Sequence, residues 1–408
     1  MSAAALNVGE GTLPAAATDE RRGAARILYV QERFPVLSET FVRNELARLR
    51  ALGVATSVTT ARRPLESWDP RAPLTAPGAP VGTSLRSCAI AHLAWVRRAP
   101  RRYATYLCVL AGAPLKDKPF VLLAPVIAQE ALGESVTHVH THFAFRGASV
   151  ARGVATLLGV TRSVTTHAND IFVRSRFLRS RLRGARVLTI SEHNREFLAA
   201  RGISSTVNHC GIDLPEAPPA QRHARTTDVV FVGRLVTKKG PLELLAAVAE
   251  LVGRGRRLTV RVVGDGPLRE ECEELARVIA LPVSFLGSLD AEATLTEIRS
   301  ARVLCLPCQV APDGDVDGIP VVLMEAMANG TAVVTTRVSG IPELVDEGSG
   351  WLVEPGPGWV TELADAVEAA LDGDDAERRT ASARAAVTRS FTLDDQARGV
   401  LAAAGVAS

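Results

Sequence analysis

Short runs of β-branched and aliphatic residues alternate with longer amphipathic stretches along most of this chain. This alternation constrains the fold more than any other feature of the sequence. Strands are expected at 26–31, 54–60, 136–141, 163–166 and 187–190, and again at 229–232, 259–263, 283–286, 303–307 and 332–335. Helices are expected at 38–52, 148–158 and 192–201, and near 241–253, 267–280, 291–301, 322–329 and 359–371. Such alternation predicts an α/β protein with parallel sheets.

A polar, proline-rich stretch separates the two series of strands and helices. Residues 214–228 read LPEAPPAQRHARTTD and are predicted to be an interdomain linker. We therefore expect an N-terminal domain at 25–213, a C-terminal domain at 229–372 and a helical segment at 373–408 that packs back toward the first domain. Residues 1–24 are expected to be a flexible tail, and residues 62–80, with five prolines, a loop. A length of 408 residues suits two domains.

Composition excludes some classes of function. A net charge of +3 is too small to indicate nucleic-acid binding. The longest apolar run, PFVLLAPVIA at 119–128, is far short of the ~20 residues that span a bilayer. The first residues lack the features of a signal peptide, so a cytoplasmic location is expected, with peripheral contact at the inner membrane face left open. Cys305 and Cys308 are expected to be buried thiols rather than zinc ligands.

The first candidate motif follows the strand at 229–232. Gly233 and Arg234 come directly after this strand, and Lys239 precedes the next helix. A glycine allows a sharp turn, and a helix N-terminus offers free N–H groups to anions. An arginine and a lysine together suit a diphosphate. The alternative is that both are solvated surface cations.

A second motif, VVGDGP at 262–267, places Gly264, Asp265 and Gly266 at the carboxyl end of a strand. Ligands of open α/β sheets bind at that edge. A simple turn is the alternative interpretation. The motif lacks the GxGxxG pattern of dinucleotide-binding proteins, which counts against a nicotinamide enzyme.

The third and most specific motif runs from Asp317 to Gly330. Gly318, Ile319 and Pro320 form a loop that enters a helix, and Glu325 lies about two turns into that helix. Backbone amides at such an entrance can hold a phosphate, while carboxylates accept hydrogen bonds from sugar hydroxyls. The alternative is an amphipathic helix with an exposed glutamate, although a carboxylate among VVLMEAMA requires a partner.

In this order, GRLVTKKG, VVGDGPL, FLG and the segment 317–345 resemble the donor half of family 4 glycosyltransferases of the GT-B fold. In the first half, FPVLSETFVRNEL, HTHFA, THANDIF and TISEHNREFL resemble the bacterial colanic-acid and exopolysaccharide branch. The resemblance covers about residues 26 to 370. It implies two Rossmann-like domains facing a central cleft. It also implies a retaining transfer of a hexosyl or N-acetylhexosaminyl group from a nucleotide-diphosphate sugar to an acceptor hydroxyl.

The resemblance also implies roles for matching residues. Arg234 and Lys239 would bind the donor diphosphate, Glu325 the ribose, and Asp317, which stands where the family usually has glutamate, the hexose. His167 would contact the transferred sugar near its anomeric centre, with Asp170 as a supporting carboxylate. The alternative for His167 is a core histidine at the end of a strand.

Acceptor-side candidates lie in the loop after the first strand. Ser38, Glu39 and Thr40 are named there, although Ser38 is equally well read as a helix N-cap. His142 either lines the same cleft or is buried for structural reasons.

No metal or other cofactor is expected, because the cations named above would stabilise the leaving group. Asp313, Asp315 and Asp317 resemble a metal-binding DxD motif and are read instead as a solvated loop. Arginines cluster at 97–102 and 174–186. They are interpreted either as a solvated helix face or as a contact for anionic lipid or a lipid-linked acceptor. No nucleic-acid partner is expected.

Three other functions stay open on the sequence. The first is a glycosyltransferase of secondary metabolism that modifies an aminoglycoside-like antibiotic. The second is a catalytically silent sugar-binding subunit, and the third is a phosphorylase. The joint presence of Arg234, Lys239 and Glu325 argues against the silent subunit.

Overall fold

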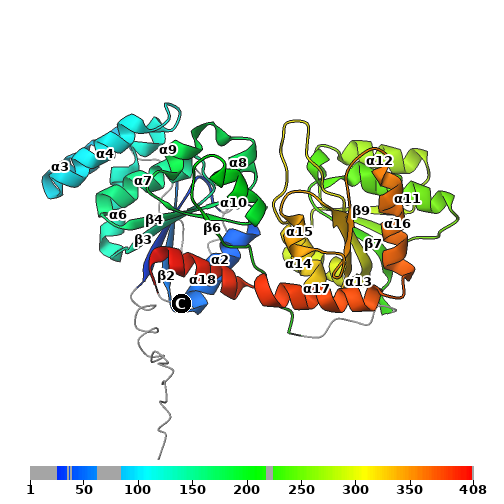
Figure 1. Cartoon of the computed structure of the whole chain (residues 1–408). Helices are drawn as coiled ribbons and strands as arrows, with labels where there is room; N and C mark the ends of the chain where they lie inside the picture. Colours follow the sequence, from blue (N-terminus) through cyan, green and yellow to red (C-terminus); the bar gives the residue numbers. More distant parts are fainter. Residues whose placement is uncertain (1–24, 35, 37–38, 62–83, 217–223, 407–408) are drawn as a thin grey trace, which may run out of the picture.

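The computed structural model describes residues 25–34, 36, 39–61, 84–216 and 224–406. These residues form two α/β domains that lie side by side, each with a central sheet flanked by helices (Figure 1). The predicted tail at 1–24, the predicted loop at 62–80 and Ser38 lie outside the described residues.

The N-terminal sheet has six parallel strands in the order β2-β1-β3-β4-β5-β6. The strands are β1 (Arg26–Gln31), β2 (Ala55–Thr60), β3 (His138–His142), β4 (Thr161–Thr166), β5 (Arg186–Thr189) and β6 (Thr206–Val207). Strands buried on both faces read as near-continuous apolar or β-branched runs, which is why most of these strands are visible in the sequence. β6 is only two residues long and was not predicted.

Helices cover both faces of this sheet (Figure 1). They are α2 (Thr40–Ala51), α3 (Leu85–Arg98), α4 (Pro100–Gly112), α5 (Lys118–Val121), α6 (Ala124–Glu130), α7 (Arg146–Leu158), α8 (Asn169–Phe172), α9 (Leu178–Leu182) and α10 (Glu192–Ala199). The sequence predicted α2, α7 and α10. It missed α3 and α4, which protrude from the domain (Figure 1), and the short α8 and α9. It also missed α5 and α6, which pack with α4 against α7.

The C-terminal sheet also has six parallel strands, in the order β12-β11-β10-β7-β8-β9. They are β7 (Thr227–Val232), β8 (Val260–Val263), β9 (Val283–Gly287), β10 (Ala301–Leu306), β11 (Ala332–Thr336) and β12 (Trp351–Val353). The helices are α11 (Pro241–Gly253), α12 (Arg269–Val278), α13 (Ala291–Ser300), α14 (Val321–Ala328), α15 (Ile341–Leu344) and α16 (Trp359–Asp372). β7 begins inside the predicted linker, because Thr227 pairs with Ala301 of the central strand β10.

The chain returns to the first domain through its last two helices, α17 (Ala376–Ser390) and α18 (Leu393–Ala404) (Figure 1). Ala397, Val400 and Leu401 of α18 belong to one buried cluster with β1 and α2. Asp394 Oδ2 also lies 2.5 Å from Arg48 Nη2 on α2. A fully buried valine or leucine side chain contributes roughly 1.5–3 kcal/mol, so this packing fixes α18 on the N-terminal domain.

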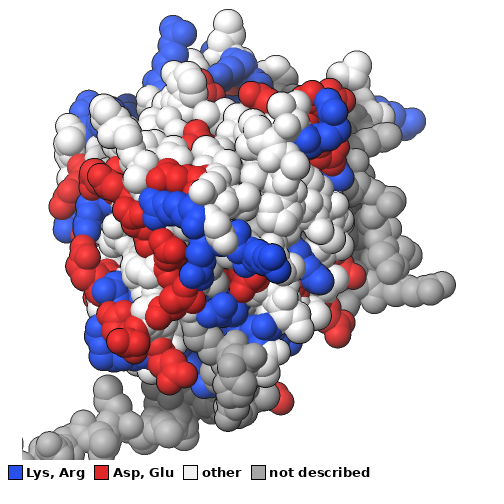
Figure 2. Space-filling view, turned by 90° about the vertical axis from the view of Figure 1, so that its right-hand side faces the viewer, with Lys and Arg blue, Asp and Glu red and all other residues white. Residues whose placement is uncertain are grey.

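Acidic and basic side chains are interspersed on the outer face of the C-terminal domain (Figure 2). Many of them pair across helices α11 and α16: Arg254 contacts both Glu250 and Asp365, and Arg256 contacts Asp372. This face therefore presents no single-sign field of the kind that attracts a polyanion.

Candidate active site between the two domains

Two lysines and two aspartates form an ion-pair cluster after strand β7. Lys239 Nζ lies 2.7 Å from Asp317 Oδ2, and Lys238 Nζ lies 3.0 Å from Asp315 Oδ2 and 3.3 Å from Asp317 Oδ1. The expectation that these aspartates belong to a solvated loop is wrong for Asp315 and Asp317, because both are partly buried and ion-paired with the lysines. Asp313 alone of the three is exposed.

The cluster is strongly coupled electrostatically. Burial alone would raise the pKa of the Asp317 carboxyl, but Lys239 and Lys238 hold it below its usual value. Burial would likewise lower the pKa of Lys239, and Asp317 raises it above the ordinary value. Both groups are therefore charged at neutral pH. The reading of Lys239 as a solvated surface cation is wrong, and the sequence analysis did not single out Lys238.

Arg234 differs from the two lysines. Its side chain is exposed, and within the described residues its guanidinium has no ion pair or hydrogen bond. Its charge nevertheless acts on Lys239, where it lowers the pKa. Arg234 is therefore a charged group at the surface of the cluster, free to turn toward a ligand.

Glycines allow the loops of this edge to approach one another closely. Gly264 has φ +132°, and a Cβ atom there would lie 1.9 Å from the Gly233 carbonyl oxygen. At Gly266 a Cβ would lie 2.5 Å from the carbonyl oxygen of Leu235. The side chain of Asp265 is exposed and pairs with Arg269 on α12, with 3.3 Å between Nη1 and Oδ2. The motif at 264–266 thus shapes the loop after β7, and Asp265 itself points to α12.

The loop 317–320 joins the lysine cluster to the first domain. A Cβ atom on Gly318 would lie 2.5 Å from Ile190 Cδ1 in the N-terminal domain. Ile319 is buried, and Pro320 precedes the first residue of α14. Ile190 follows β5, and Thr189 of β5 pairs with Thr166 of β4, the residue before His167. The loop of Asp317 therefore abuts the sheet edge from which His167 leaves.

Glu325 is the fifth residue of α14, so it lies little more than one turn into the helix and not the two turns that the sequence suggested. Burial raises the pKa of its carboxyl. Within the described residues, neither a hydrogen bond nor an ion pair reaches this carboxylate. A half-buried carboxylate without a partner is costly, and it matches the predicted role of receiving ligand hydroxyls.

His167 is packed between aromatic rings at the carboxyl end of β4. Its ring centroid lies 4.6 Å from that of Phe41 and 4.3 Å from that of Phe143, and its side chain is 6% exposed. Phe143 has φ +65°, an unusual conformation for a bulky residue and one that clusters at functional sites. Burial lowers the pKa of His167 well below its usual value, so the imidazole is neutral.

Asp170 supports the backbone beside His167. Its carboxylate accepts hydrogen bonds from the amides of Ala144, at 2.7 Å, and His167, at 2.9 Å. Burial raises its pKa to about 6, although both amides act in the opposite direction. Asp170 holds the loop and is itself fully buried.

The acceptor-side candidates lie at the start of α2. Burial raises the pKa of the Glu39 carboxyl to about 7, partly offset by nearby His142. Thr40 is half-buried as the first residue of α2. His142 is only 3% exposed and lies between Glu45 and His167, so it is buried behind His167.

Glu343 forms a direct contact between the domains that the sequence analysis missed. Its carboxylate accepts hydrogen bonds from the backbone amides of Glu192, at 2.8 Å, and His193, at 3.0 Å. These amides open helix α10, where an acidic group is favourable. His209 Nε2 lies 3.2 Å from the same carboxylate. The second domain thus caps a helix of the first.

The arginine cluster at 174–186 divides into two kinds of residue. Arg181 is buried, and its guanidinium donates to both oxygens of Asp117, at 2.9 and 3.0 Å. The solvated reading is wrong for this residue. Arg176, Arg179 and Arg183 line a surface hollow of about 420 Å³ together with Arg201. None of the described helices combines the length and apolar character needed to cross a membrane.

Cys305 and Cys308 are both fully buried free thiols, as expected. Burial raises the pKa of each above its usual range. Cys308 Sγ lies 3.7 Å from Asp317 Oδ2 and so forms one wall of the lysine cluster.

Sequence relatives agree with this geometry. Residues 226–373 match the model of the family described as glycosyl transferases group 1. The putative colanic acid biosynthesis glycosyltransferase WcaL of Escherichia coli is 40% identical over 156 residues, which cover 36% of this chain and 37% of the relative. This chain therefore spans little more than a third of that relative's length. A GDP-mannose-dependent alpha-(1-6)-phosphatidylinositol monomannoside mannosyltransferase of Mycolicibacterium smegmatis is 29% identical over 293 residues, covering 68% and 70%.

Solved structures match over nearly the whole chain. A glycosyltransferase from Rickettsia africae has a TM-score of 0.67 at 16% identity and covers 93% of this chain and 97% of its own. Anabaena Alr3699/HepE in complex with UDP has a TM-score of 0.63 at 16% identity, covering 93% and 98%. The fold is the two-domain GT-B fold that the resemblance implied. In sequence, the domain at residues 226–373 is similar to the group 1 glycosyl transferases.

Proposed function

We propose that the chain is a retaining, metal-independent glycosyltransferase. It would move a hexosyl or N-acetylhexosaminyl group from a nucleotide-diphosphate sugar to an acceptor hydroxyl. Two observations in the domain whose sequence matches the family carry this proposal. Lys238 and Lys239 are charged and ion-paired, and the Glu325 carboxylate has no partner among the described residues. Such a set can bind two phosphates and a ribose.

Donor binding would exchange one anion for another at the lysines. Asp317 and Asp315 together neutralise Lys239 and Lys238. A diphosphate placed between these lysines and Arg234 would release the Asp317 carboxylate, which could then accept hydrogen bonds from the hexose. The solved neighbour in complex with UDP supports a uridine or similar nucleotide as one donor class to test.

The chemical step follows from charge. Breaking the bond between the sugar and the diphosphate leaves negative charge on the departing phosphate and positive charge on the sugar ring. Fixed cations stabilise the departing phosphate, and one well-placed donor of this kind contributes ~3–4 kcal/mol. His167, held neutral among aromatic rings, would position a sugar hydroxyl. The departing phosphate would take the proton of the acceptor hydroxyl on the same face, which keeps the anomeric configuration.

Closure of the two domains would limit hydrolysis of the donor. Glu343 already bridges them by capping α10, and Gly318 packs on Ile190. A site shut in this way excludes water while the sugar is transferred.

Bacterial polysaccharide or glycoconjugate biosynthesis is the proposed setting. The relative named for colanic acid biosynthesis supports it. The proposed location is the cytoplasm, with peripheral contact at the inner membrane face.

An apolar and basic surface on the protruding helices supports membrane contact. Leu85, Ile90, Leu93 and Val96 of α3 are all exposed, and basic residues follow them at Arg97, Arg98 and Arg101. Exposed apolar groups beside cations suit a membrane that carries anionic lipid. Flotation with vesicles of anionic lipid, but not with neutral vesicles, is the expected result. Equal recovery with both vesicle types would contradict it.

The transfer itself is tested with a panel of donors. Purified protein is incubated with UDP-glucose, UDP-N-acetylglucosamine, GDP-mannose or ADP-glucose together with mono- and disaccharide acceptors, and release of the nucleoside diphosphate is followed with and without EDTA. We expect release with at least one donor, unchanged by EDTA, and a product whose anomeric configuration equals that of the donor. Loss of activity in EDTA, or an inverted product, would contradict the proposed mechanism. No release with any donor would contradict the function.

A further inference from the structure

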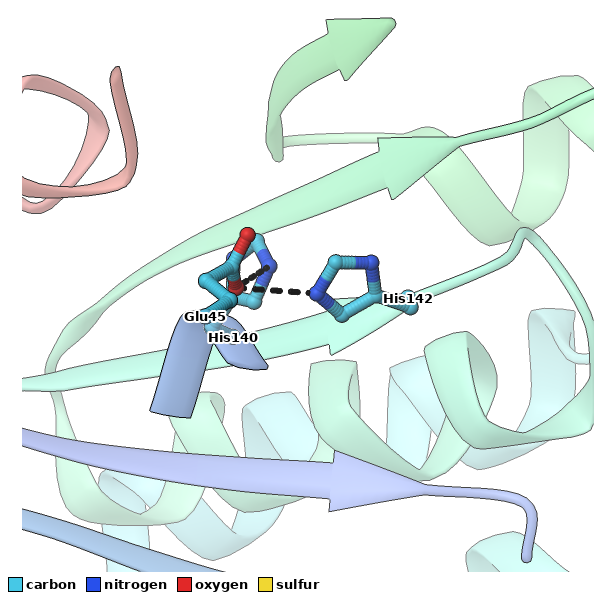
Figure 3. A group of neighbouring side chains, drawn as sticks. All are labelled: Glu45, His140 and His142. Atoms are coloured by element: carbon cyan, nitrogen blue, oxygen red, sulfur yellow. Dashed lines mark hydrogen bonds and ion pairs between the residues drawn. The ribbon is translucent and has the colours of Figure 1, made fainter. Parts of the chain in front are cut away.

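A continuous line of buried side chains connects the C-terminal helix to His167. Gln396 Nε2 of α18 donates to Glu45 Oε2 at 2.6 Å. Glu45 Oε1 lies 2.9 Å from His142 Nε2, and His142 Nδ1 lies 3.1 Å from His167 Nε2. Figure 3 shows Glu45 of α2 beside the two histidines of β3. All of these side chains are buried.

The charge of Glu45 sets the direction of the bonds. Burial alone would raise its pKa, but His142, His140 and Tyr29 together lower it to about 2. An ionised carboxylate can only accept hydrogen bonds. His142 Nε2 must therefore carry a proton and donate it, as must the hydroxyl of Tyr29, 2.6 Å from Oε1.

The proton on His142 then determines the tautomer of His167. When each ring carries one proton, His142 Nδ1 is an acceptor, and His167 Nε2 must be the donor. The Nδ1 atom of His167 is left with a free lone pair, and it makes no hydrogen bond to any described residue. An imidazole shows a fixed tautomer when a second group holds its other nitrogen.

We propose that Glu45 and His142 are positioning residues for the transfer reaction. They hold the ring of His167 through Nε2, so that Nδ1 accepts a hydrogen bond from a hydroxyl of the transferred sugar. This inference rests on the proposed function and extends it by naming the atom that meets the sugar and the two residues that prepare it.

A metal ion is the competing use of the same residues. Glu45, His140 and His142 each offer one ligand atom within 4.8 Å of the others. Hydrogen bonds already use these atoms, however. His140 Nδ1 lies 2.6 Å from Ser163 Oγ, and His140 Nε2 lies 3.3 Å from Thr165 Oγ1, whereas Glu45 Oε1 is 3.9 Å from that nitrogen. The geometry therefore favours the hydrogen-bonded chain over an ion.

Other ionisable groups also face this chain. They are Tyr29 from β1, His140 from β3, Asp170 from α8, Glu39 at the start of α2, and Cys210, whose pKa burial and Glu45 both raise. A pH profile of activity therefore reports the whole group, and the position of the His167 proton has to be observed directly.

Nitrogen-15 NMR of histidine-labelled protein observes that proton. In the wild type, we expect His167, assigned by its loss in His167→Gln, to show a protonated Nε2 and an unprotonated Nδ1. Glu45→Gln supplies an amide that can donate to His142 Nε2 as well as accept from it, so the direction of the hydrogen bond between the two side chains is no longer fixed. We expect a mixed or reversed tautomer at His167 in this variant. We also expect kcat to fall about 10- to 100-fold, with KM for the donor within about twofold.

Tyr29→Phe is the matched control. It removes a hydrogen bond to the same carboxylate at 2.6 Å but leaves the bond to His142. We expect the wild-type tautomer and a kcat within about twofold of wild type. If circular dichroism shows that Glu45→Gln does not fold, His142→Gln takes its place. We expect the same fall in kcat, because a glutamine side chain at position 142 cannot reach both Glu45 and His167.

The remaining outcomes contradict either this inference or the proposed function. A wild-type His167 protonated at Nδ1, or wild-type spectra and kcat in Glu45→Gln, would overturn the inference. So would a stoichiometric metal, found by mass spectrometry, that Glu45→Gln loses. If the wild type transfers no sugar from UDP-glucose or GDP-mannose, the proposed function fails, whereas the NMR measurement still tests the chain from Glu45 to His167.

Discussion

Lys239 Nζ lies 2.7 Å from Asp317 Oδ2, so the cation predicted to bind the donor diphosphate is neutralised by the carboxylate predicted to bind the donor sugar. The two residues come from different loops of the C-terminal domain, 78 positions apart by their numbers (317 − 239). A donor carries both a diphosphate and a sugar, and it can therefore satisfy both residues at once when it separates them.

Asp317→Asn is expected to separate binding of the nucleotide from transfer of the sugar. The asparagine removes the charge that competes for Lys239 and Lys238, so UDP or GDP without a sugar should bind several-fold more tightly. Transfer should fall at least tenfold, because an amide accepts fewer hydrogen bonds from the hexose. Calorimetric titration measures the binding of UDP or GDP, and the transfer assay measures the fall in turnover. Weaker nucleotide binding in this variant would contradict the exchange of anions.

Glu325→Gln is expected to exchange function for stability. The carboxylate is half-buried and has no partner within the described residues, so its neutral analogue should raise Tm. The amide should bind ribose hydroxyls less well and raise Kd for the nucleoside diphosphate about tenfold. Differential scanning calorimetry measures Tm, and calorimetric titration measures Kd for the nucleoside diphosphate. A variant with unchanged Kd would remove Glu325 from the binding site.

Gly264→Ala is expected to destabilise the C-terminal domain. The residue has φ +132°, and an added Cβ would lie 1.9 Å from the carbonyl oxygen of Gly233. The backbone strain alone costs on the order of 2 kcal/mol, and the clash adds to it. Gly253→Ala is the control, because nothing lies within 4 Å of its Cβ position and its φ is not left-handed. Similar Tm values for the two variants would refute the close approach of these loops.

Glu39 is expected to govern the pH dependence of transfer. Burial raises its pKa from 4.5 to about 7. Its carboxylate, the form that can accept a bond from an acceptor hydroxyl, therefore forms as the pH rises from 6 to 8. We expect kcat/KM for the acceptor to rise over this range and Glu39→Gln to flatten the profile.

The contribution of Glu39 to the stability of the fold should fall as the pH rises, whereas kcat/KM for the acceptor rises. A carboxyl whose native pKa is raised contributes stability that is present below pH 4.5 and is lost as the pH rises through about 7. Glu39→Gln should therefore gain in Tm relative to wild type between pH 5 and 8. If the pH profile of kcat/KM in Glu39→Gln still has its inflection near pH 7, another group governs the pH dependence of transfer.

The sequence was sufficient to predict ten of the twelve described strands, because strands buried on both faces are rich in apolar or β-branched residues. It also placed Lys239, Asp317 and Glu325 on the correct loops and helix. It missed helix α3, whose exposed Leu85, Ile90 and Leu93 blur the amphipathic pattern, and helix α4, where Leu107 is exposed in the same way. β12 is only three residues long, too short for a periodicity to be visible.

The missed site residues share one cause. Glu45 reads in the sequence as an ordinary polar position of α2, and only tertiary packing sets it against His142 and Gln396. Glu343 likewise meets the amide of Glu192 across 151 positions of the chain. Pairs that form between distant segments leave no local pattern, so a single sequence cannot indicate them.

Calorimetric titration of Lys239→Ala with UDP and with GDP tests the central claim most directly. The matched control is Arg277→Ala, whose exposed side chain pairs with Glu274 on the surface of α12. We expect wild type and control to bind at least one of the two nucleotides with the same Kd. In folded Lys239→Ala we expect binding at least tenfold weaker. Equal Kd values for all three proteins, or no binding of either nucleotide to the wild type, would contradict the account.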